Sequence, residues 1–90
     1  MLSSVADLWV KDGFVLWLRF SDGAEGEWDF ADIVAQTGPM VEPLKDPDYF
    51  RRVFLEWGAP TWPNGYDVAP DALYERMSEA KRLSRPPHAA

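Results

Sequence analysis

Two Asp-Gly pairs in the first third of the chain constrain its fold more than any other feature. Asp12-Gly13 and Asp22-Gly23 flank residues 14–20, where apolar side chains recur at every second position. That period is typical of a β-strand with one buried face. Asp-Gly favours a tight turn, and a type I′ turn requires positive φ at both central residues. The pattern therefore predicts an antiparallel meander with type I′ turns.

The whole sequence predicts the α+β class, with an antiparallel β-meander of three strands, a second short β-hairpin, short central helices and one longer C-terminal helix. We expect the meander strands at residues 5–10, 14–20 and 24–29. The hairpin strands are expected at residues 53–57 and 60–62, joined by a turn at Gly58-Ala59.

Proline and aspartate positions mark where the helices begin. Asp29 can cap a short helical segment at residues 30–35, and Asp46 can cap another at residues 47–52. Pro70 opens the only long helix, expected at residues 70–84. One face of that helix carries four apolar side chains, namely Leu73, Met77, Ala80 and Leu83.

The length of 90 residues fits one domain, which we expect at residues 1–84, followed by a flexible C-terminal tail at residues 85–90. A domain this small buries only about 60–65 % of the surface that its unfolded chain exposes. Its composition supplies the large apolar side chains that it needs, with 47 % hydrophobic residues and five tryptophans. We expect at least two or three of those tryptophans to lie in the core.

Three absences from the sequence indicate its compartment and its chemistry. The first residues show neither the basic segment nor the apolar run of a signal peptide, and no apolar stretch approaches the ~20 residues of a membrane span. The chain has no cysteine, and its one histidine, His88, follows two prolines. We therefore expect a cytoplasmic protein with no membrane contact, no cofactor and no metal, and we expect that it is not an enzyme.

Charge is distributed unevenly along the chain. Residues 1–75 contain fourteen acidic and five basic side chains, a net −9, which disfavours binding to nucleic acid. Residues 76–90 carry +3, because Glu79 is outnumbered by four basic residues, Arg76, Lys81, Arg82 and Arg85. Those cations either complement the dipole at the C-terminus of the long helix or make a weak contact with phosphate groups.

Acidic residues alternate along the third expected strand, so that Glu25, Glu27 and Asp29 share one face of the sheet. They form either an acidic stripe for a basic partner or a divalent cation, or a solvated face that discourages edge pairing. Trp17 on the neighbouring strand is a candidate partner-binding residue if its side chain is exposed.

The segment from residue 62 to residue 74 carries the densest set of turn and helix signals. Asn64-Gly65 allows positive φ, Asp67 can accept bonds from backbone N–H groups, and Pro70 starts the long helix. The segment is either a structural corner or part of a partner-binding site, for which the candidates are Trp62, Asn64, Asp67 and Tyr74.

The same segment resembles the signature of the family called domain of unknown function 2442, through Trp62-Pro63-Asn64-Gly65, Asp67, Pro70 and Leu73-Tyr74. Residues 20–23, 29–30 and 43–50 are similar to its second turn, third strand and central connector, so the resemblance covers residues 5 to about 75. It implies a small α+β domain, bacterial in most cases, with no established catalytic residues. Some relatives are suspected antitoxins, and others carry a fused helix-turn-helix, for which too few residues follow here.

These observations favour a non-catalytic protein-binding module, the antitoxin-like partner of a small basic toxin. An acidic domain suits a basic surface because complementary charge speeds encounter and fixes orientation. One alternative is a small-ligand or metal-binding, enzyme-like domain that uses Asp22, Asp29 and Asp67. A second alternative is an accessory domain whose basic C-terminal helix makes weak contact with nucleic acid.

Overall fold

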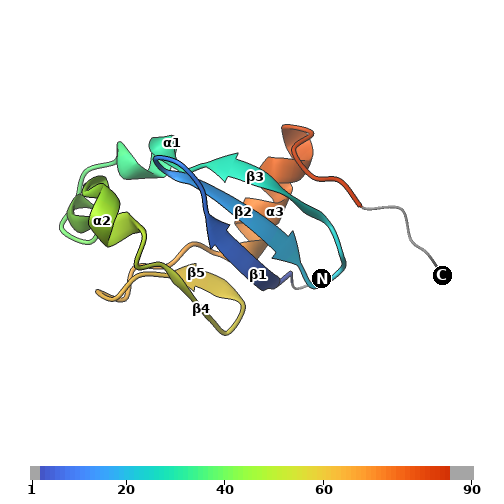
Figure 1. The fold of residues 1–90 in the computed structure, drawn as a ribbon, viewed down its shortest axis with the longest axis horizontal. Helices are drawn as coiled ribbons and strands as arrows, with labels where there is room; N and C mark the ends of the chain where they lie inside the picture. The colour runs from blue at the N-terminus through green and yellow to red at the C-terminus, as the bar shows by residue number, and fades with distance from the viewer. Residues whose placement is uncertain (1–2, 86–90) are drawn as a thin grey trace.

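The computed structural model describes residues 3–85, and the predicted α+β architecture is confirmed (Figure 1). His88 and most of the expected tail lie outside the described residues. In chain order the elements are β1 (Val5–Val10), β2 (Val15–Phe20), β3 (Glu25–Asp29), α1 (Ala31–Val34), the 3₁₀ helix η1 (Glu42–Lys45), α2 (Pro47–Phe50), β4 (Phe54–Glu56), β5 (Ala59–Thr61) and α3 (Pro70–Glu79).

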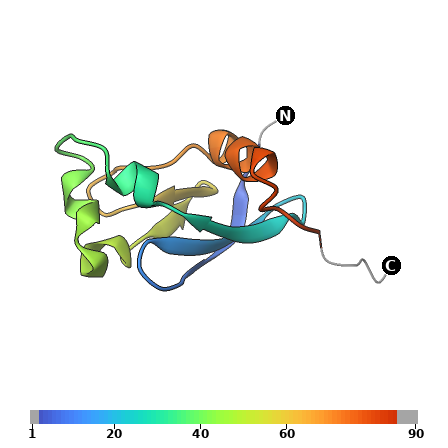
Figure 2. The same cartoon turned by 90° about the horizontal axis from the view of Figure 1, so that it is seen from above.

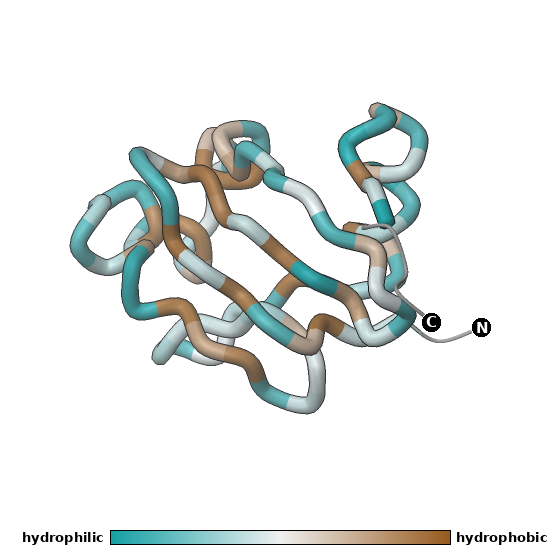
Figure 3. Tube along the Cα trace, turned by 45° about the vertical axis from the view of Figure 1, so that its right-hand side comes forward, coloured by the Kyte–Doolittle hydropathy of each residue, from teal (hydrophilic) through white to brown (hydrophobic). Residues whose placement is uncertain are grey.

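The first three strands form an antiparallel sheet in the order β1-β2-β3, as the alternating pattern predicts. Along β2, Leu16, Leu18 and Phe20 are buried, and the residues between them are exposed or half-buried. Figure 3 shows this alternation as brown and teal segments along the strands. One face of the sheet is therefore core, and we call it the inner face.

Both meander turns differ from the predicted type I′ geometry. Gly13 and Gly23 have φ of +62° and +93°, whereas the aspartate before each keeps a negative φ. Backbone bonds close three-residue loops instead, from Lys11 N–H to the Val15 carbonyl and from Phe20 N–H to the Ala24 carbonyl, each at 2.8 Å. A three-residue loop needs the left-handed conformation at only one position, which glycine supplies.

The second hairpin contains the type I′ turn that the meander lacks. Trp57 and Gly58 both have positive φ, +53° and +76°, and Glu56 pairs with Ala59 across them. The expected turn at Gly58-Ala59 is thus displaced by one residue. The hairpin lies beside β1, and the N–H of Val5 donates to the Gly58 carbonyl at 2.8 Å.

The predicted cap is confirmed at α2, whereas the cap position of α1 is Phe30, one residue after the predicted Asp29, and no side chain caps it. The Asp46 carboxylate accepts the N–H of Asp48 at 3.0 Å at the start of α2. The Asp29 carboxylate accepts the N–H of Ala31 at 2.9 Å where β3 passes into α1. In both places an aspartate satisfies a backbone donor that the first helical turn leaves without a partner.

The long helix ends five residues earlier than predicted. Lys81 adopts a φ of +57°, and the N–H of Arg82 donates to the Met77 carbonyl at 2.8 Å, a bond typical of a left-handed helix terminus. Leu83 consequently lies beyond the helix, where it packs against the core from an extended segment. Ala80, expected on the apolar face, is exposed.

Helix α3 packs on the inner face of the sheet, on the side where α1 also lies (Figure 2). Its buried side chains, Leu73 and Met77, join the core cluster formed by the buried residues of β2. Trp62 lies at the other end of the core, fully buried, with ring centroids 5.4 Å from Phe50 and 6.4 Å from Phe30. Its indole N–H donates to the Phe50 carbonyl at 2.9 Å. It therefore ties the segment after β5 to α2.

Trp62→Phe is expected to lower the free energy of unfolding by about 1–3 kcal/mol, because it removes buried apolar volume and the indole hydrogen bond, so that the Phe50 carbonyl keeps only the N–H of Val53 at 3.2 Å. The matched control is Trp57→Phe at a position that is 96 % exposed, with an expected change below about 0.5 kcal/mol. Urea unfolding measures both variants. Equal losses would contradict the assigned core role of Trp62.

Candidate functional site

The face of the sheet opposite α3 brings together three of the predicted partner-binding residues, Trp17, Glu25 and Glu27. Paired residues in an antiparallel ladder share a face. The register aligns Trp9 with Trp17 and Trp17 with Glu27, so β1, β2 and β3 each contribute to one row. We call this surface the outer sheet face; its members are Asp7, Trp9, Val15, Trp17, Arg19, Glu25, Glu27 and Asp29.

Trp9 is the most exposed apolar side chain of the outer sheet face, at 67 %. Ion pairs flank it on both sides. Arg19 contacts Asp7, and the Lys11 Nζ lies 3.7 Å from a Glu27 carboxylate oxygen. An aromatic centre inside a charged rim is the usual composition of a protein interface, and exposed surface ion pairs add little stability to the fold itself.

Three of the predicted candidates, Trp17, Glu25 and Glu27, lie on this face, and all three are half-buried. The acidic stripe along β3 is also next to basic residues that the sequence placed on the long helix. The Arg82 Nε lies 3.4 Å from the Glu27 carbonyl, and Lys81 and Arg82 line a surface hollow beside Glu27. The stripe is thus already accompanied by cations from its own chain.

Trp62 and Asn64 form a structural corner, not an exposed site. Trp62 has no accessible surface with which to contact a partner. The Asn64 side-chain amide donates to the Met40 carbonyl at 2.9 Å, and its oxygen accepts the N–H of Tyr66 at 3.1 Å. Both side chains therefore serve the loop between β5 and α3.

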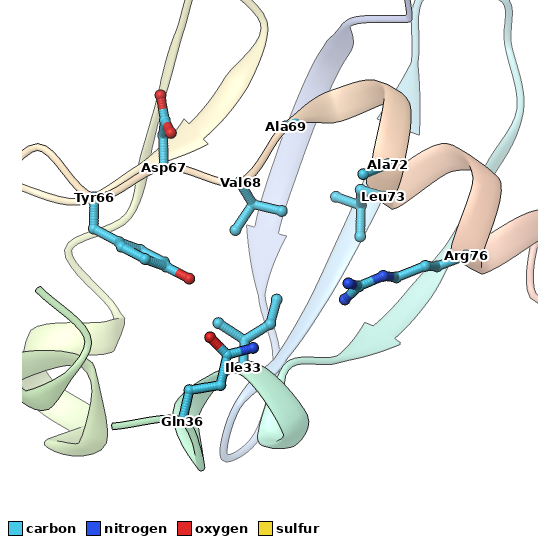
Figure 4. A pocket seen from close by; sticks show the side chains of 9 residues that line it. All are labelled: Ile33, Gln36, Tyr66, Asp67, Val68, Ala69, Ala72, Leu73 and Arg76. Carbon is cyan, nitrogen blue, oxygen red and sulfur yellow. The ribbon is translucent and has the colours of Figure 1, made fainter. Parts of the chain in front are cut away.

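Asp67 lies at the rim of a hollow of about 180 Å³ between α1, the corner and α3 (Figure 4). Ile33 and Leu73 form its apolar floor, while the Arg76 guanidinium and the Tyr66 hydroxyl point into it. The Asp67 carboxylate points away from this space in Figure 4. The hollow is small beside ordinary ligand pockets of roughly 300–1,000 Å³.

Tyr74 belongs to a third location, a network with Asp22 and Arg85. Its hydroxyl donates to an Asp22 carboxylate oxygen at 2.6 Å, and the Arg85 guanidinium donates to the same oxygen at 2.7 Å. The bond from Tyr74, followed by the N–H of Ala24 and the charge of Arg85, holds the pKa of Asp22 below its ordinary 3.8. The network joins the second meander turn, α3 and the segment after it.

The alternative site of Asp22, Asp29 and Asp67 is not assembled. Asp22 is held by Tyr74 and Arg85, Asp29 accepts the N–H of Ala31, and Asp67 lies at the hollow near the corner. Within residues 3–85 no three His, Cys, Asp or Glu side chains are grouped closely enough to hold a metal ion. The metal-binding alternative therefore loses its proposed ligand set.

The predicted basic helix does not form as one surface. Of its four cations only Arg76 lies within α3, because the helix ends at Glu79. Arg82 and Arg85 contact β3 and Asp22 instead.

In the described part of the chain no helix combines the length and apolar composition that crossing a membrane requires.

Two exposed tryptophans were not among the predicted candidates. Trp9 could have been found from the meander, because an antiparallel register places it opposite Trp17. Trp57 is 96 % exposed at the tip of the β4–β5 turn. The sequence signal for its exposure is weaker than that for Trp9, because it consists only of a position before glycine in a tight turn. A large aromatic side chain with positive φ is unfavourable at an exposed turn.

The geometry defines a small α+β domain with one face of its sheet covered by a helix and one aromatic, charged face left open. The family model described as "Protein of unknown function (DUF2442)" matches residues 5–79, and the chain belongs to that family. The predicted resemblance is thus confirmed. The comparison with curated proteins found no match, and the comparison with solved structures found none.

Asp22→Asn is expected to make stability less sensitive to acid. A lowered pKa in the folded state means that the Asp22 carboxylate stabilises the fold above its ordinary value of 3.8. That contribution disappears as the pH falls through the lowered folded value. The difference in unfolding free energy between the wild type and Asp22→Asn should therefore be largest near neutral pH. It should shrink as the pH falls below 3.8.

Urea unfolding at a series of pH values measures this difference. Tyr74→Phe should reproduce the effect in part, because it removes the largest cause of the lowered pKa. Tyr66→Phe, at a tyrosine outside this network, is the matched control and should leave the pH dependence unchanged. A difference that stays constant across the acid range would contradict the assigned network.

Proposed function

We propose that the chain is a non-catalytic protein-binding module that docks a basic partner protein on its outer sheet face. The observation that carries the proposal is Trp9, an aromatic side chain left 67 % exposed on β1 between the ion pairs of the outer sheet face. Tryptophan is enriched among the residues that dominate binding energy in protein interfaces. Trp9 pairs across the ladder with the half-buried Trp17, so the exposed aromatic surface is a patch of two tryptophans and not one isolated side chain.

The sign of the charge supports the chemistry of the partner. The outer sheet face carries Asp7, Glu25, Glu27 and Asp29 against Arg19, with Lys11 at its edge. The larger part of the chain, residues 1–75, has a net charge of −9. A basic partner therefore meets an attractive field before contact and an acidic rim after it.

The finer form of the proposal is an antitoxin-like role toward a small basic toxin. Its support is the family resemblance together with this acidic surface. Masking of a basic toxin surface requires only a complementary face, and no chemical step. The absence of cysteine and the position of the single histidine at residue 88 support the same non-enzymatic assignment.

The test is capture of the partner from the native host, followed by measurement of its affinity with purified proteins. We expect a stoichiometric basic protein, and Trp9→Ala should weaken its binding about 30-fold, the effect of losing an interface hot spot. Met40→Ala is the matched control, since Met40 is 43 % exposed but lies in the loop before η1. Equal binding by wild type and Trp9→Ala would refute docking on this face.

The antitoxin-like form has its own test. Cells that express the captured partner alone should grow more slowly than cells that also express this chain. Trp9→Ala should restore the growth defect in proportion to its lost affinity. A captured partner that has no effect on growth would leave the binding proposal standing and remove the antitoxin role.

A further inference from the structure

Strand β3 is an edge strand: within residues 3–85 no strand of the sheet pairs with its second side. In an antiparallel ladder successive residues direct their backbone groups alternately to one side of the strand and to the other. Gly26 and Trp28 pair with β2 through their backbone, so Glu25, Glu27 and Asp29 direct their N–H and carbonyl groups away from it. These three residues form a strand edge beside the outer sheet face.

The segment after α3 occupies only the beginning of this edge. We call residues 82–85 the C-terminal strap. The N–H of Glu25 donates to the Ser84 carbonyl and the N–H of Ser84 donates to the Glu25 carbonyl, both at 2.8 Å, in antiparallel sense. Among residues 3–85 no backbone carbonyl outside the sheet accepts the N–H of Glu27 or Asp29. The strap backbone thus pairs with one of the three positions, and the Arg82 side chain contacts the carbonyl of a second, Glu27.

The end of the helix explains why the strap stops there. Lys81 has a positive φ that turns the chain. The N–H of Arg82 donates to the Met77 carbonyl, so it does not pair with β3. The Arg82 carbonyl then lies so close to Gly26 that a Cβ at that glycine would be 1.9 Å from its oxygen. The strap therefore approaches β3 closely but cannot continue the ladder toward Glu27.

The chemistry of the strap indicates what this edge accepts. Arg82 and Arg85 are basic, and Arg85 contacts the Asp22 carboxylate while Arg82 contacts the Glu27 carbonyl. Beyond the strap, a shallow hollow of about 420 Å³ lies beside the uncovered part of the edge. Its lining residues are Trp28, Asp29, Ala31, Asp32 and Arg82.

We propose that the β3 edge is a strand-accepting site, that the C-terminal strap is its displaceable occupant, and that a basic extended segment of the partner protein replaces the strap. Such a segment pairs with Glu25, Glu27 and Asp29 in turn, and so forms a longer ladder than the strap does. Its alternate side chains lie beside the acidic stripe, where lysine or arginine is favoured. The intervening side chains point toward the hollow beside Trp28. This inference rests on the proposed protein-binding function. It adds that the β3 edge binds an extended basic segment of the partner.

The test uses the full chain, labelled with ¹⁵N, and a synthetic peptide of about eight residues in which lysine alternates with valine. Ser84→Pro removes the N–H that bonds Glu25 and weakens the strap. The peptide should shift the amide signals of Glu25, Glu27 and Asp29, and half-saturation of Ser84→Pro should need about five- to tenfold less peptide than the wild type. Ser84→Ala keeps the backbone N–H and should behave as the wild type.

Two control peptides separate strand addition from charge attraction. A peptide methylated at the backbone nitrogen of every lysine keeps its charge but loses the donors of the edge that places lysine beside the acidic stripe, and it should bind at least tenfold more weakly. A peptide with glutamate in place of lysine keeps the backbone but reverses the charge, and it should bind at least tenfold more weakly. Equal shifts from the methylated and unmethylated peptides would overturn the proposal.

Hydrogen exchange of the wild type keeps the proposal testable even if Ser84→Pro unfolds. The amides of Glu25 and Ser84 should exchange faster than that of Leu16 in the central strand, because a displaceable strap opens without global unfolding. Equal protection at all three would contradict it. Loss of partner binding in Trp9→Ala with no peptide effect at β3 would refute this inference alone and leave the proposed function intact.

Discussion

The rest of the structure depends on one packing constraint: a sheet of three strands has two faces, and this chain places a long helix on only one of them. Leu73 and Met77 of α3 meet the buried side chains of β2, and that contact makes the inner face the core. The outer sheet face then has to remain compatible with water. It does so with ion pairs around Trp9 and with half-buried aromatic and acidic side chains.

The same constraint explains why the chain needs its second hairpin and its corner. One helix of ten residues cannot close both the inner face and the end of the sheet near α2. Trp62 fills that end, with its indole N–H satisfied by the Phe50 carbonyl. The residues of the corner that looked like a site in the sequence, Trp62 and Asn64, are engaged in holding this junction.

Local signals in the sequence predicted most of the elements but not their ends. Period-two alternation and aspartates at helix starts act within a few residues, so β2, α1 and α2 could be placed from sequence alone. The end of α3 could not, because Lys81 takes a left-handed conformation that lysine does not signal. Gly26 has an ordinary φ, and its role became visible only from the Arg82 carbonyl beside it.

The candidate surface was predictable only in part, for a similar reason. Spacing along β3 placed Glu25 and Glu27 on one face, and that holds in the structure. Their pairing with a basic segment from beyond α3, and the network of Asp22 with Tyr74 and Arg85, join residues more than fifty positions apart. Such tertiary contacts leave no periodic trace in one sequence.

Hydroxyl-radical footprinting of the chain, free and in complex with its captured partner, shows which tryptophan the partner covers. If the partner docks on the outer sheet face, oxidation of Trp9 falls strongly in the complex, while oxidation of the exposed Met40 stays at its value in the free chain. Undiminished oxidation of Trp9 in a saturated complex would contradict the proposal, because the partner would then bind somewhere other than the outer sheet face.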